Sequence, residues 1–181
     1  MNAPPGRPGI SWWVALRALV WSALFVVVVA IYLPTTYFGL APSRASIATP
    51  AGVAGLLGIG AGTLLMIACV TEFATRGRGT PAPMDPPRHL VVRGPYRVVR
   101  NPMYLGMVLV LLGELALAPS RGLAGYIAGW FVCIHLLVVL YEEPTLRRKF
   151  GSAYEAYMLE VRRWWPRIPP PRRPDGERPV R

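Results

Sequence analysis

Residues 102–141 read PMYLGMVLVLLGELALAPSRGLAGYIAGWFVCIHLLVVLY, which is two apolar runs joined by a short polar turn. The first run covers residues 102–118 and the second covers residues 122–141. A helix needs about 20 mostly apolar residues to cross a bilayer, with a lower limit near 17. The turn around Pro119-Ser120-Arg121 is short enough to join two antiparallel neighbours. This stretch therefore predicts a hairpin of two membrane-spanning helices.

Two further apolar runs precede the hairpin. Residues 12–33 contain a single charge, Arg17, and are longer than the apolar region of a signal peptide, so we expect a retained span. Residues 51–71 are rich in Gly and Ala, and Gly58 and Gly62 form a G-x-x-x-G pattern that favours close helix packing. We expect an all-α, polytopic membrane bundle of about four transmembrane helices.

The composition supports a membrane protein and excludes several other classes. Hydrophobic residues make up 53% of the 181 residues and charged residues 16%, against about 25% charged in soluble domains. A disordered, collagen-like or disulfide-stapled secreted chain is excluded. The net charge is +11, but the arginines flank apolar spans, so we expect membrane lipids rather than nucleic acid as partners. Cys69 and Cys133 lie within spans without metal-ligand spacing, so no metal site is expected.

The positions of the basic residues orient the bundle. Residues 34–50 hold one arginine and the turn at 119–121 holds one, whereas residues 147–181 hold ten basic side chains. The positive-inside rule therefore predicts a multi-pass protein of the inner (plasma) membrane with both termini in the cytoplasm. The loop between the second and third spans is placed on the same side by six arginines: Arg76, Arg78, Arg88, Arg93, Arg97 and Arg100.

The chain is expected to form one domain between two tails. Residues 1–11 and 166–181 are rich in Pro and Arg and predict disorder, which leaves residues 12–165 as a single membrane domain. Ser152 and Glu155 have the spacing of a capping box that opens a C-terminal cytoplasmic helix. One face of that helix is apolar, which fits either an interfacial helix or a helix packed on the loop beneath the bundle. Its members are Tyr154, Tyr157, Met158 and Val161.

The start of the third span is the first candidate site. Asn101 can act as an N-cap, and Pro102 suits the first helical position. Free backbone N–H groups at a helix start can hold a carboxylate or a phosphate. The alternative is that Asn-Pro simply begins a helix.

The inner end of the fourth span is the second candidate site. Glu142 and Glu143 are adjacent there, where the negative end of the helix dipole disfavours carboxylates. Nearby arginines or a cationic ligand must compensate for this charge. The alternative to a ligand is a solvated pair neutralised by Arg147 and Arg148.

Together these two segments resemble a known family. The first segment reads G-P-Y-R-V-V-R-N-P-M-Y-L-G from Gly94, and the second runs from Glu142-Glu143 to Pro166 through a spaced set of residues. This order, around a short hairpin, resembles the isoprenylcysteine carboxyl methyltransferase and phospholipid methyltransferase superfamily, over about residues 88–166. The spaced set is Leu146, Phe150, Gly151, Tyr154, Tyr157, Val161 and Arg163.

The resemblance implies an enzyme that uses S-adenosylmethionine (SAM) as methyl donor at the cytoplasmic mouth of the bundle. The helix start at Asn101 suits the carboxylate of SAM, and Glu142 suits its ammonium group. Tyr96 and Tyr104 can contact the adenine or the sulfonium. The implied cofactor-binding residues are Arg88, His89, Leu90, Val91, Gly94, Tyr96, Asn101, Pro102, Met103, Tyr104 and Glu142.

Two departures from the family pattern bear on the substrate. The usual His between Arg and Pro is Asn101 here, which keeps hydrogen-bonding ability but removes an imidazole. Val138 stands where the prenylcysteine-specific members have an arginine for the substrate carboxylate. We therefore expect a different acceptor, a small lipophilic or lipid-like molecule, methylated on O, N or S.

Tyr104 and His135 are the candidate catalytic residues. Methyl transfer asks mainly for alignment and a water-poor site. A carboxylate or thiolate acceptor needs no base, whereas an amine must first lose a proton. His135 lies about 9 Å from the inner end of the fourth span, at 1.5 Å per residue, and can line an acceptor channel or act as a base. For Glu114, deep in the third span, we expect a carboxyl group held within the bundle.

Two other functions are compatible with the sequence. An NADPH-dependent membrane reductase of the steroid-reductase type shares the general architecture and lacks a Gly-rich dinucleotide loop. A non-catalytic membrane scaffold is compatible with the Gly-rich second span and the basic tails. The oligomeric state is left open.

Overall fold

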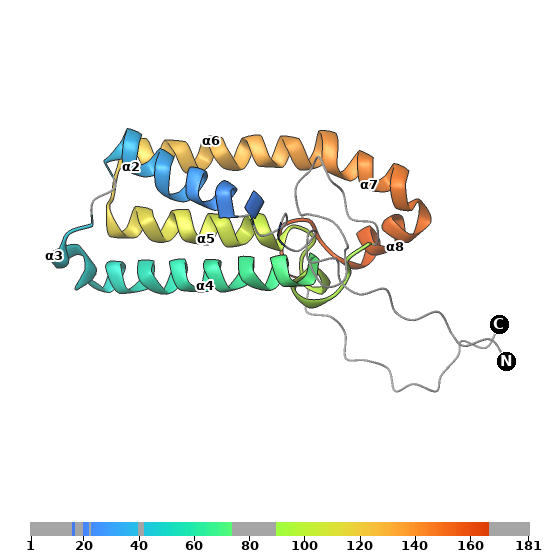
Figure 1. Cartoon of the computed structure of the whole chain (residues 1–181), viewed down its shortest axis with the longest axis horizontal. Coiled ribbons are helices and arrows are strands. Elements are labelled where there is room, and N and C mark those ends of the chain that lie inside the picture. The colour runs from blue at the N-terminus through green and yellow to red at the C-terminus, as the bar shows by residue number, and fades with distance from the viewer. Residues whose placement is uncertain (1–15, 17–19, 22, 40–41, 74–89, 167–181) are drawn as a thin grey trace, which may run out of the picture.

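The computed structural model describes residues 16, 20–21, 23–39, 42–73 and 90–166. Within these ranges the protein is all-helical and has no strand, which confirms the predicted fold class. Long helices lie side by side along the molecule, and α8 lies at the end where α7 turns away from the bundle (Figure 1). In chain order the elements are η1 (Val27–Tyr32), α2 (Leu33–Phe38), α3 (Arg44–Ile47), α4 (Pro50–Glu72), η3 (Gly94–Arg97), α5 (Pro102–Leu117), α6 (Arg121–Leu137), η4 (Val138–Glu142), α7 (Glu143–Phe150) and α8 (Ser152–Glu160).

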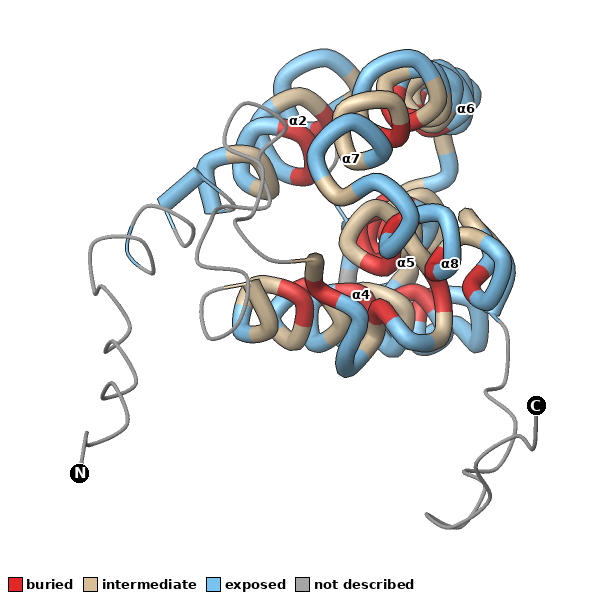
Figure 2. The backbone as a smooth tube through the Cα atoms, turned by 90° about the vertical axis from the view of Figure 1, so that its right-hand side faces the viewer, coloured by how far each residue is buried: buried red, intermediate tan, exposed pale blue. Residues whose placement is uncertain are grey.

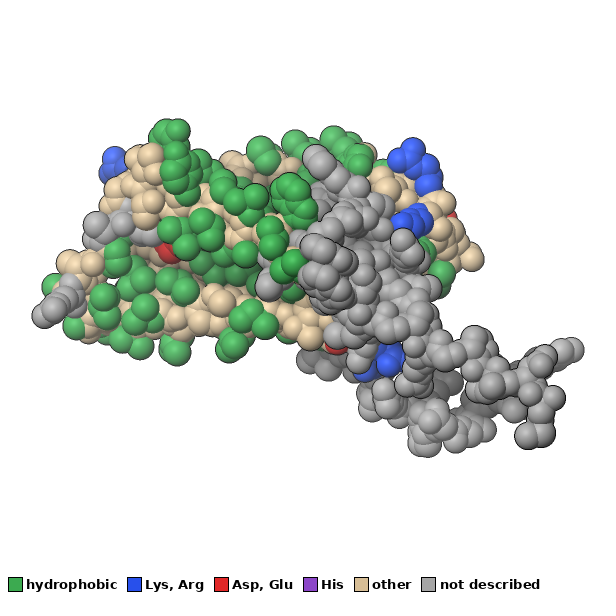
Figure 3. Space-filling view, in the orientation of Figure 1, with side chains coloured by type: hydrophobic (Ala, Val, Ile, Leu, Met, Phe, Trp, Pro, Cys, Tyr) green, Lys and Arg blue, Asp and Glu red, His purple; other side chains and the backbone are tan. Residues whose placement is uncertain are grey.

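The helices have the lengths and surfaces of a membrane bundle. Two of them, Pro50–Glu72 and the continuous helix Arg121–Phe150, are long and apolar enough to cross a bilayer. Ala23–Phe38 and Pro102–Leu117 are shorter apolar helices. Figure 3 shows hydrophobic side chains along the bundle on the face drawn, with Lys and Arg side chains toward its ends. Apolar side chains exposed along a bundle are what a lipid environment requires.

Glycines bring α4 and α5 into close contact. A Cβ atom built on Gly62 would lie 2.4 Å from the carbonyl oxygen of Gly106, and one on Gly113 would lie 2.4 Å from that of Gly55. Only glycine allows two backbones to approach this closely. The buried residues of the two helices face each other along this contact (Figure 2). The predicted small-residue packing of the second span is therefore present, and its partner is the third span.

Replacing Gly62 with alanine should destabilise the protein by about 1–3 kcal/mol, the usual cost of overpacking a tight contact. The added methyl group meets backbone, which can yield only if α4 and α5 separate. Gly60 is the matched control on the same helix, because a Cβ there meets nothing within 4 Å. Unfolding in detergent, followed by tryptophan fluorescence, should show a loss for Gly62→Ala and little change for Gly60→Ala. Equal stabilities of the two variants would contradict this packing.

Two helices contain a wide π-turn just before a proline. η1 precedes Pro34 and η4 precedes Pro144. Proline has no N–H, and its ring clashes with the carbonyl one turn earlier, so a wider turn lets the helix continue. Around Pro34, the Leu33 N–H bonds the Val28 carbonyl. The Val29 carbonyl accepts instead from the Tyr126 hydroxyl of α6, at 2.9 Å.

Because of these π-turns, two helices run beyond their predicted ends. The first continues past residue 33 to Phe38 and ends at Gly39, whose φ of 62° suits a C-terminal glycine. The second continues past residue 141 to Phe150 as η4 and α7. α4 and α5 instead lie within one residue of the predicted spans, 51–71 and 102–118. The extension through α7 carries the two adjacent glutamates beyond the apolar part of the helix.

The predicted capping box of the C-terminal helix is wrong. α8 already includes Ser152, its N-cap is Gly151, and no side chain caps it. The reason is that α7 ends at Gly151, which has a positive φ and turns the chain directly into α8. The apolar face of α8 packs under the bundle, as in the second alternative above, because Tyr154, Tyr157 and Val161 are buried with Leu90 and Phe150.

Candidate active site

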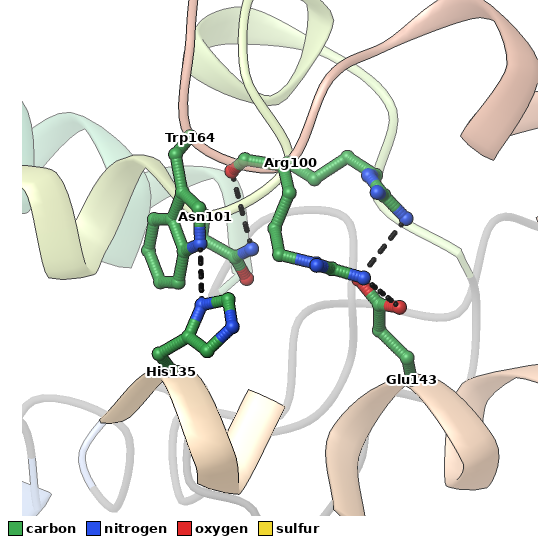
Figure 4. A network of polar contacts seen from close by, with 6 residues as sticks. Arg100, Asn101, His135, Glu143 and Trp164 are labelled. Carbon is green, nitrogen blue, oxygen red and sulfur yellow. Dashed lines mark hydrogen bonds and ion pairs between the residues drawn. The ribbon is translucent and has the colours of Figure 1, made fainter. Parts of the chain in front are cut away.

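The segment that follows α8, residues 161–166, lies against the start of α5. The backbone N–H of Arg100 donates to the Arg162 carbonyl at 2.9 Å. The side-chain amide of Asn101 donates to the Arg163 carbonyl at 3.2 Å (Figure 4). Asn101 is the N-cap residue of α5, as predicted, but its side chain makes no capping hydrogen bond. The first turn of α5 therefore keeps backbone N–H groups that no side-chain cap satisfies.

Glu143 is the centre of a buried ion network that fixes this segment. Both of its carboxylate oxygens accept from Arg163, at 2.7 and 2.8 Å. Arg100 Nη1 lies 3.1 Å from Glu143 Oε1 but, within the described residues, makes no hydrogen bond, so it contributes through charge. Hydrogen bonding to Glu143 raises the pKa of Arg163 above its ordinary value.

The network argues against one alternative for the glutamate pair, in which the pair is solvated and neutralised by Arg147 and Arg148. Those two arginines are exposed on α7, whereas Glu143 is buried. Its partners are Arg100, just before α5, and Arg163, beyond α8. Buried carboxylates require close charged partners, and these two arginines reach Glu143 because the chain folds back over the start of α5.

Glu142 points to a different neighbour. The hydroxyl of Tyr104, in the first turn of α5, donates to Glu142 Oε1. Both side chains are half-buried. This hydrogen bond joins the two motifs at the candidate site, beside the backbone and side-chain bonds of Arg100 and Asn101 to residues 162 and 163. The acidic end of one helix and the start of the other are thus in direct contact.

Aromatic rings surround this contact. The ring of Tyr104 has its centroid 6.5 Å from those of both Trp130 and Trp164. Trp164 also lies 5.1 Å from Phe131 and 6.0 Å from His135. We call Tyr104, Trp130, Phe131, His135 and Trp164 the aromatic cluster. Its tryptophan rings flank Tyr104, the residue that bonds Glu142, and aromatic faces of this kind attract cations.

The remaining predicted cofactor residues that the structure describes are divided between two buried clusters and the start of α5. Val91, Tyr96 and Cys69 are buried together, and Met103 packs against them. The ring of Tyr96 meets Phe73 edge-on at 5.3 Å, rather than a member of the aromatic cluster. Pro102 is buried at the start of α5, whereas Leu90 packs against α8. Arg88 and His89 lie outside the described residues.

Gly94 and Tyr96 link the η3 turn to its neighbours. Gly94 has a φ of +56°, and a Cβ there would lie 3.0 Å from the Glu72 carboxylate. The Tyr96 carbonyl accepts from the Tyr157 hydroxyl of α8 at 2.7 Å. Burial raises the pKa of both tyrosines, so they remain neutral. These contacts hold η3 between the end of α4 and α8.

The structure therefore brings the two predicted motifs together, and it adds the two tryptophans Trp130 and Trp164 and the pairing of Arg100 and Arg163, both already in the motifs, with Glu143. Trp164 and Trp130 carry no pattern that marks them in advance. Arg100 and Arg163 could have been found from the need of adjacent glutamates for compensating charge. Glu114 is buried in α5 away from these contacts, and its Oε2 has no hydrogen-bond partner among the described residues. Within the same part of the chain, no three His, Cys, Asp or Glu side chains are grouped to hold a metal.

Comparison with known proteins identifies the family. Searches of the curated proteins and of the solved structures found no match. A family model described as phospholipid methyltransferase matches residues 51–153, more than half of the chain. The match includes α4, α5, α6 and Glu142, and it ends before the segment that carries Arg163 and Trp164. The chain therefore belongs to the phospholipid methyltransferase family, a family of membrane methyltransferases.

Proposed function

We propose that the protein transfers a methyl group from SAM to a small lipophilic or lipid-like acceptor. The observation that carries this proposal is the contact between Tyr104 and Glu142, which joins the helix start and the acidic helix end in one site. Family membership supports the methyl transfer. The donor and the acceptor are our inference from the chemistry of the site.

The residues present fit the charges of the proposed donor. SAM carries a carboxylate, an ammonium group and a sulfonium. Glu142 supplies a carboxylate for the ammonium, and the Tyr104, Trp130 and Trp164 rings supply faces for positive charge. The first turn of α5, with no side-chain cap, supplies N–H groups for the carboxylate.

When bound, SAM would supply a methyl group activated by a positively charged sulfur, and S-adenosylhomocysteine, a neutral thioether at that sulfur, would be the leaving group. The tasks of the protein are to align the partners and to exclude water. We assign alignment to Glu142 and Tyr104 and the exclusion of water to the aromatic cluster. The network of Glu143, Arg100 and Arg163 holds residues 161–166 over the site and has a positioning role.

We further propose that the site opens to the cytoplasm at the inner (plasma) membrane, with both termini on that side. The basic side chains of α7 and the arginines of the sequence between α4 and α5 support this orientation. A lipophilic acceptor then enters from the bilayer, past the exposed apolar side chains of α6 and η4, such as Val132, Leu136 and Leu140.

The family membership favours methyl transfer over the two other functions considered. Reduction with NADPH would require a site for a dinucleotide with several negative charges, whereas the site described here presents a carboxylate within an aromatic cluster. A non-catalytic scaffold would not require Glu142 to be held in a half-buried position by Tyr104. A competition assay on the purified protein distinguishes the reductase from the methyltransferase: a methyltransferase binds S-adenosylhomocysteine in preference to NADPH, and a reductase does the reverse.

Labelled SAM tests the proposal directly. Membranes that contain the protein are incubated with methyl-labelled SAM. Lipophilic products are then extracted, and their masses are measured by mass spectrometry. We expect a product heavier by one labelled methyl group and, at SAM concentrations below saturation, much less of it from membranes that contain the Glu142→Gln variant at equal abundance. Equal labelling by the two membranes would overturn the proposal.

A further inference from the structure

The hydrogen bond between Trp164 and His135 fixes the chemistry of that histidine. Trp164 Nε1 lies 3.0 Å from His135 Nδ1 (Figure 4). An indole N–H can only donate, so His135 Nδ1 must accept. A neutral imidazole carries one proton, and with Nδ1 accepting, that proton is on Nε2. His135 is therefore held in the tautomer that presents an N–H from Nε2.

This tautomer cannot act as a base while the bond persists. The lone pair of Nδ1 is used by Trp164, and Nε2 already carries a proton. To take a proton, His135 would have to break its bond to Trp164. The sequence left open whether His135 lines an acceptor channel or removes a proton, and this geometry favours the first role.

His135 is also in the right region to meet the acceptor. It lies on the same continuous helix as Glu142, seven residues earlier and so about 10 Å deeper in the bilayer, at 1.5 Å per residue. Glu142 accepts a hydrogen bond from Tyr104, and His135 accepts one from Trp164. The rings of Tyr104 and Trp164 have their centroids 6.5 Å apart. Among the described residues, Nε2 of His135 has no hydrogen-bond partner.

We propose that Trp164 is a positioning residue that holds His135 as an Nε2–H donor, and that this donor binds an oxygen on the head of the lipophilic acceptor. The acceptor class is then an amphiphile with an accepting oxygen, such as a carboxylate, rather than an amine that needs deprotonation. This inference rests on the proposed function, because it assumes that an acceptor binds beside Trp164. The tautomer itself does not depend on that function.

The tautomer can be measured on the full chain. The protein has two histidines, so nitrogen NMR of protein labelled with ¹⁵N on histidine, in lipid nanodiscs, gives signals from two imidazole rings. The variant His89→Gln removes one set of signals and so assigns the other to His135. We expect His135 protonated on Nε2 in the wild type. In Trp164→Phe, which keeps an aromatic ring but removes the N–H, we expect the single ring proton of His135 to exchange between Nδ1 and Nε2, so that the Nδ1–H tautomer is also populated. A wild-type signal protonated on Nδ1, or a tautomer unchanged in a folded Trp164→Phe variant, would overturn the proposal.

The acceptor class is tested by adding two probes of equal chain length, dodecanoate and dodecylamine, in the presence of S-adenosylhomocysteine. Dodecanoate should shift the His135 Nε2–H signal, and dodecylamine should not. A shift with dodecylamine, or none with dodecanoate, would overturn the acceptor class. If S-adenosylhomocysteine fails to bind while the tautomer is as expected, the proposed function fails and the assignment of Trp164 stands.

Discussion

Replacing Glu142 with glutamine is expected to weaken the binding of S-adenosylhomocysteine by about 10- to 100-fold. A hydrogen bond to a charged group contributes about 1.5–3 kcal/mol, and each 1.4 kcal/mol is about tenfold in affinity. Glutamine keeps the size of the side chain and can still accept from the Tyr104 hydroxyl, so the contact between the helices remains. The variant therefore removes the charge and little else. Isothermal titration of the two purified proteins measures the effect.

Glu155→Gln is the matched control for this experiment. Glu155 is an exposed glutamate on α8, and the same change in charge there should leave the affinity unaltered. A Glu142→Gln variant that binds as tightly as Glu155→Gln would show that the carboxylate of Glu142 does not meet the ammonium group. An equal loss in both variants would show that net charge, rather than this side chain, controls binding.

Replacing Glu143 with alanine is expected to lower the free energy of unfolding by about 3–5 kcal/mol, because removing one partner of a buried ion pair leaves uncompensated charge. Arg100, whose side chain is 10% exposed, would lose its counter-charge, and Arg163 would lose two hydrogen bonds. Residues 161–166 would then be held less firmly on the start of α5. Titration of the folded protein in mixed micelles with a denaturing detergent gives the free energy of unfolding.

Two variants make this second result interpretable. Glu155→Ala removes an exposed glutamate and should cost less than about 0.5 kcal/mol, as surface substitutions usually do. The double variant Glu143→Met with Arg100→Met removes both buried charges and should recover part of the loss, because apolar replacements of a buried pair are often tolerated. The account of the network is wrong if Glu143→Ala and Glu155→Ala have the same stability.

The helices were predictable where sequence pattern alone sets their limits. As expected, Asn101-Pro102 begins α5, and the turn at Pro119-Ser120 separates the end of α5 from the start of α6. The continuation through Pro34 and Pro144 was not predictable, since a proline after an apolar run usually marks the end of a helix. Here a π-turn before each proline absorbs the missing hydrogen bond.

The candidate site was predictable only in part. Glu142 and Tyr104 belong to two motifs around a short hairpin, so their meeting follows from antiparallel neighbours. The contacts of Trp164 with His135, and of Arg163 with Glu143, join residues 29 and 20 positions apart in the chain. They depend on how the chain turns at Gly151 and returns after α8. Neither local propensity nor hydrophobic periodicity specifies that return.

Isothermal titration of the full wild-type chain with S-adenosylhomocysteine tests the central claim most directly, because it asks whether the meeting point of Tyr104 and Glu142 binds the product of the proposed donor. The account predicts saturable binding at one site per chain, weakened in Glu142→Gln. A folded protein that releases no heat of binding at ligand concentrations up to the millimolar range would contradict it.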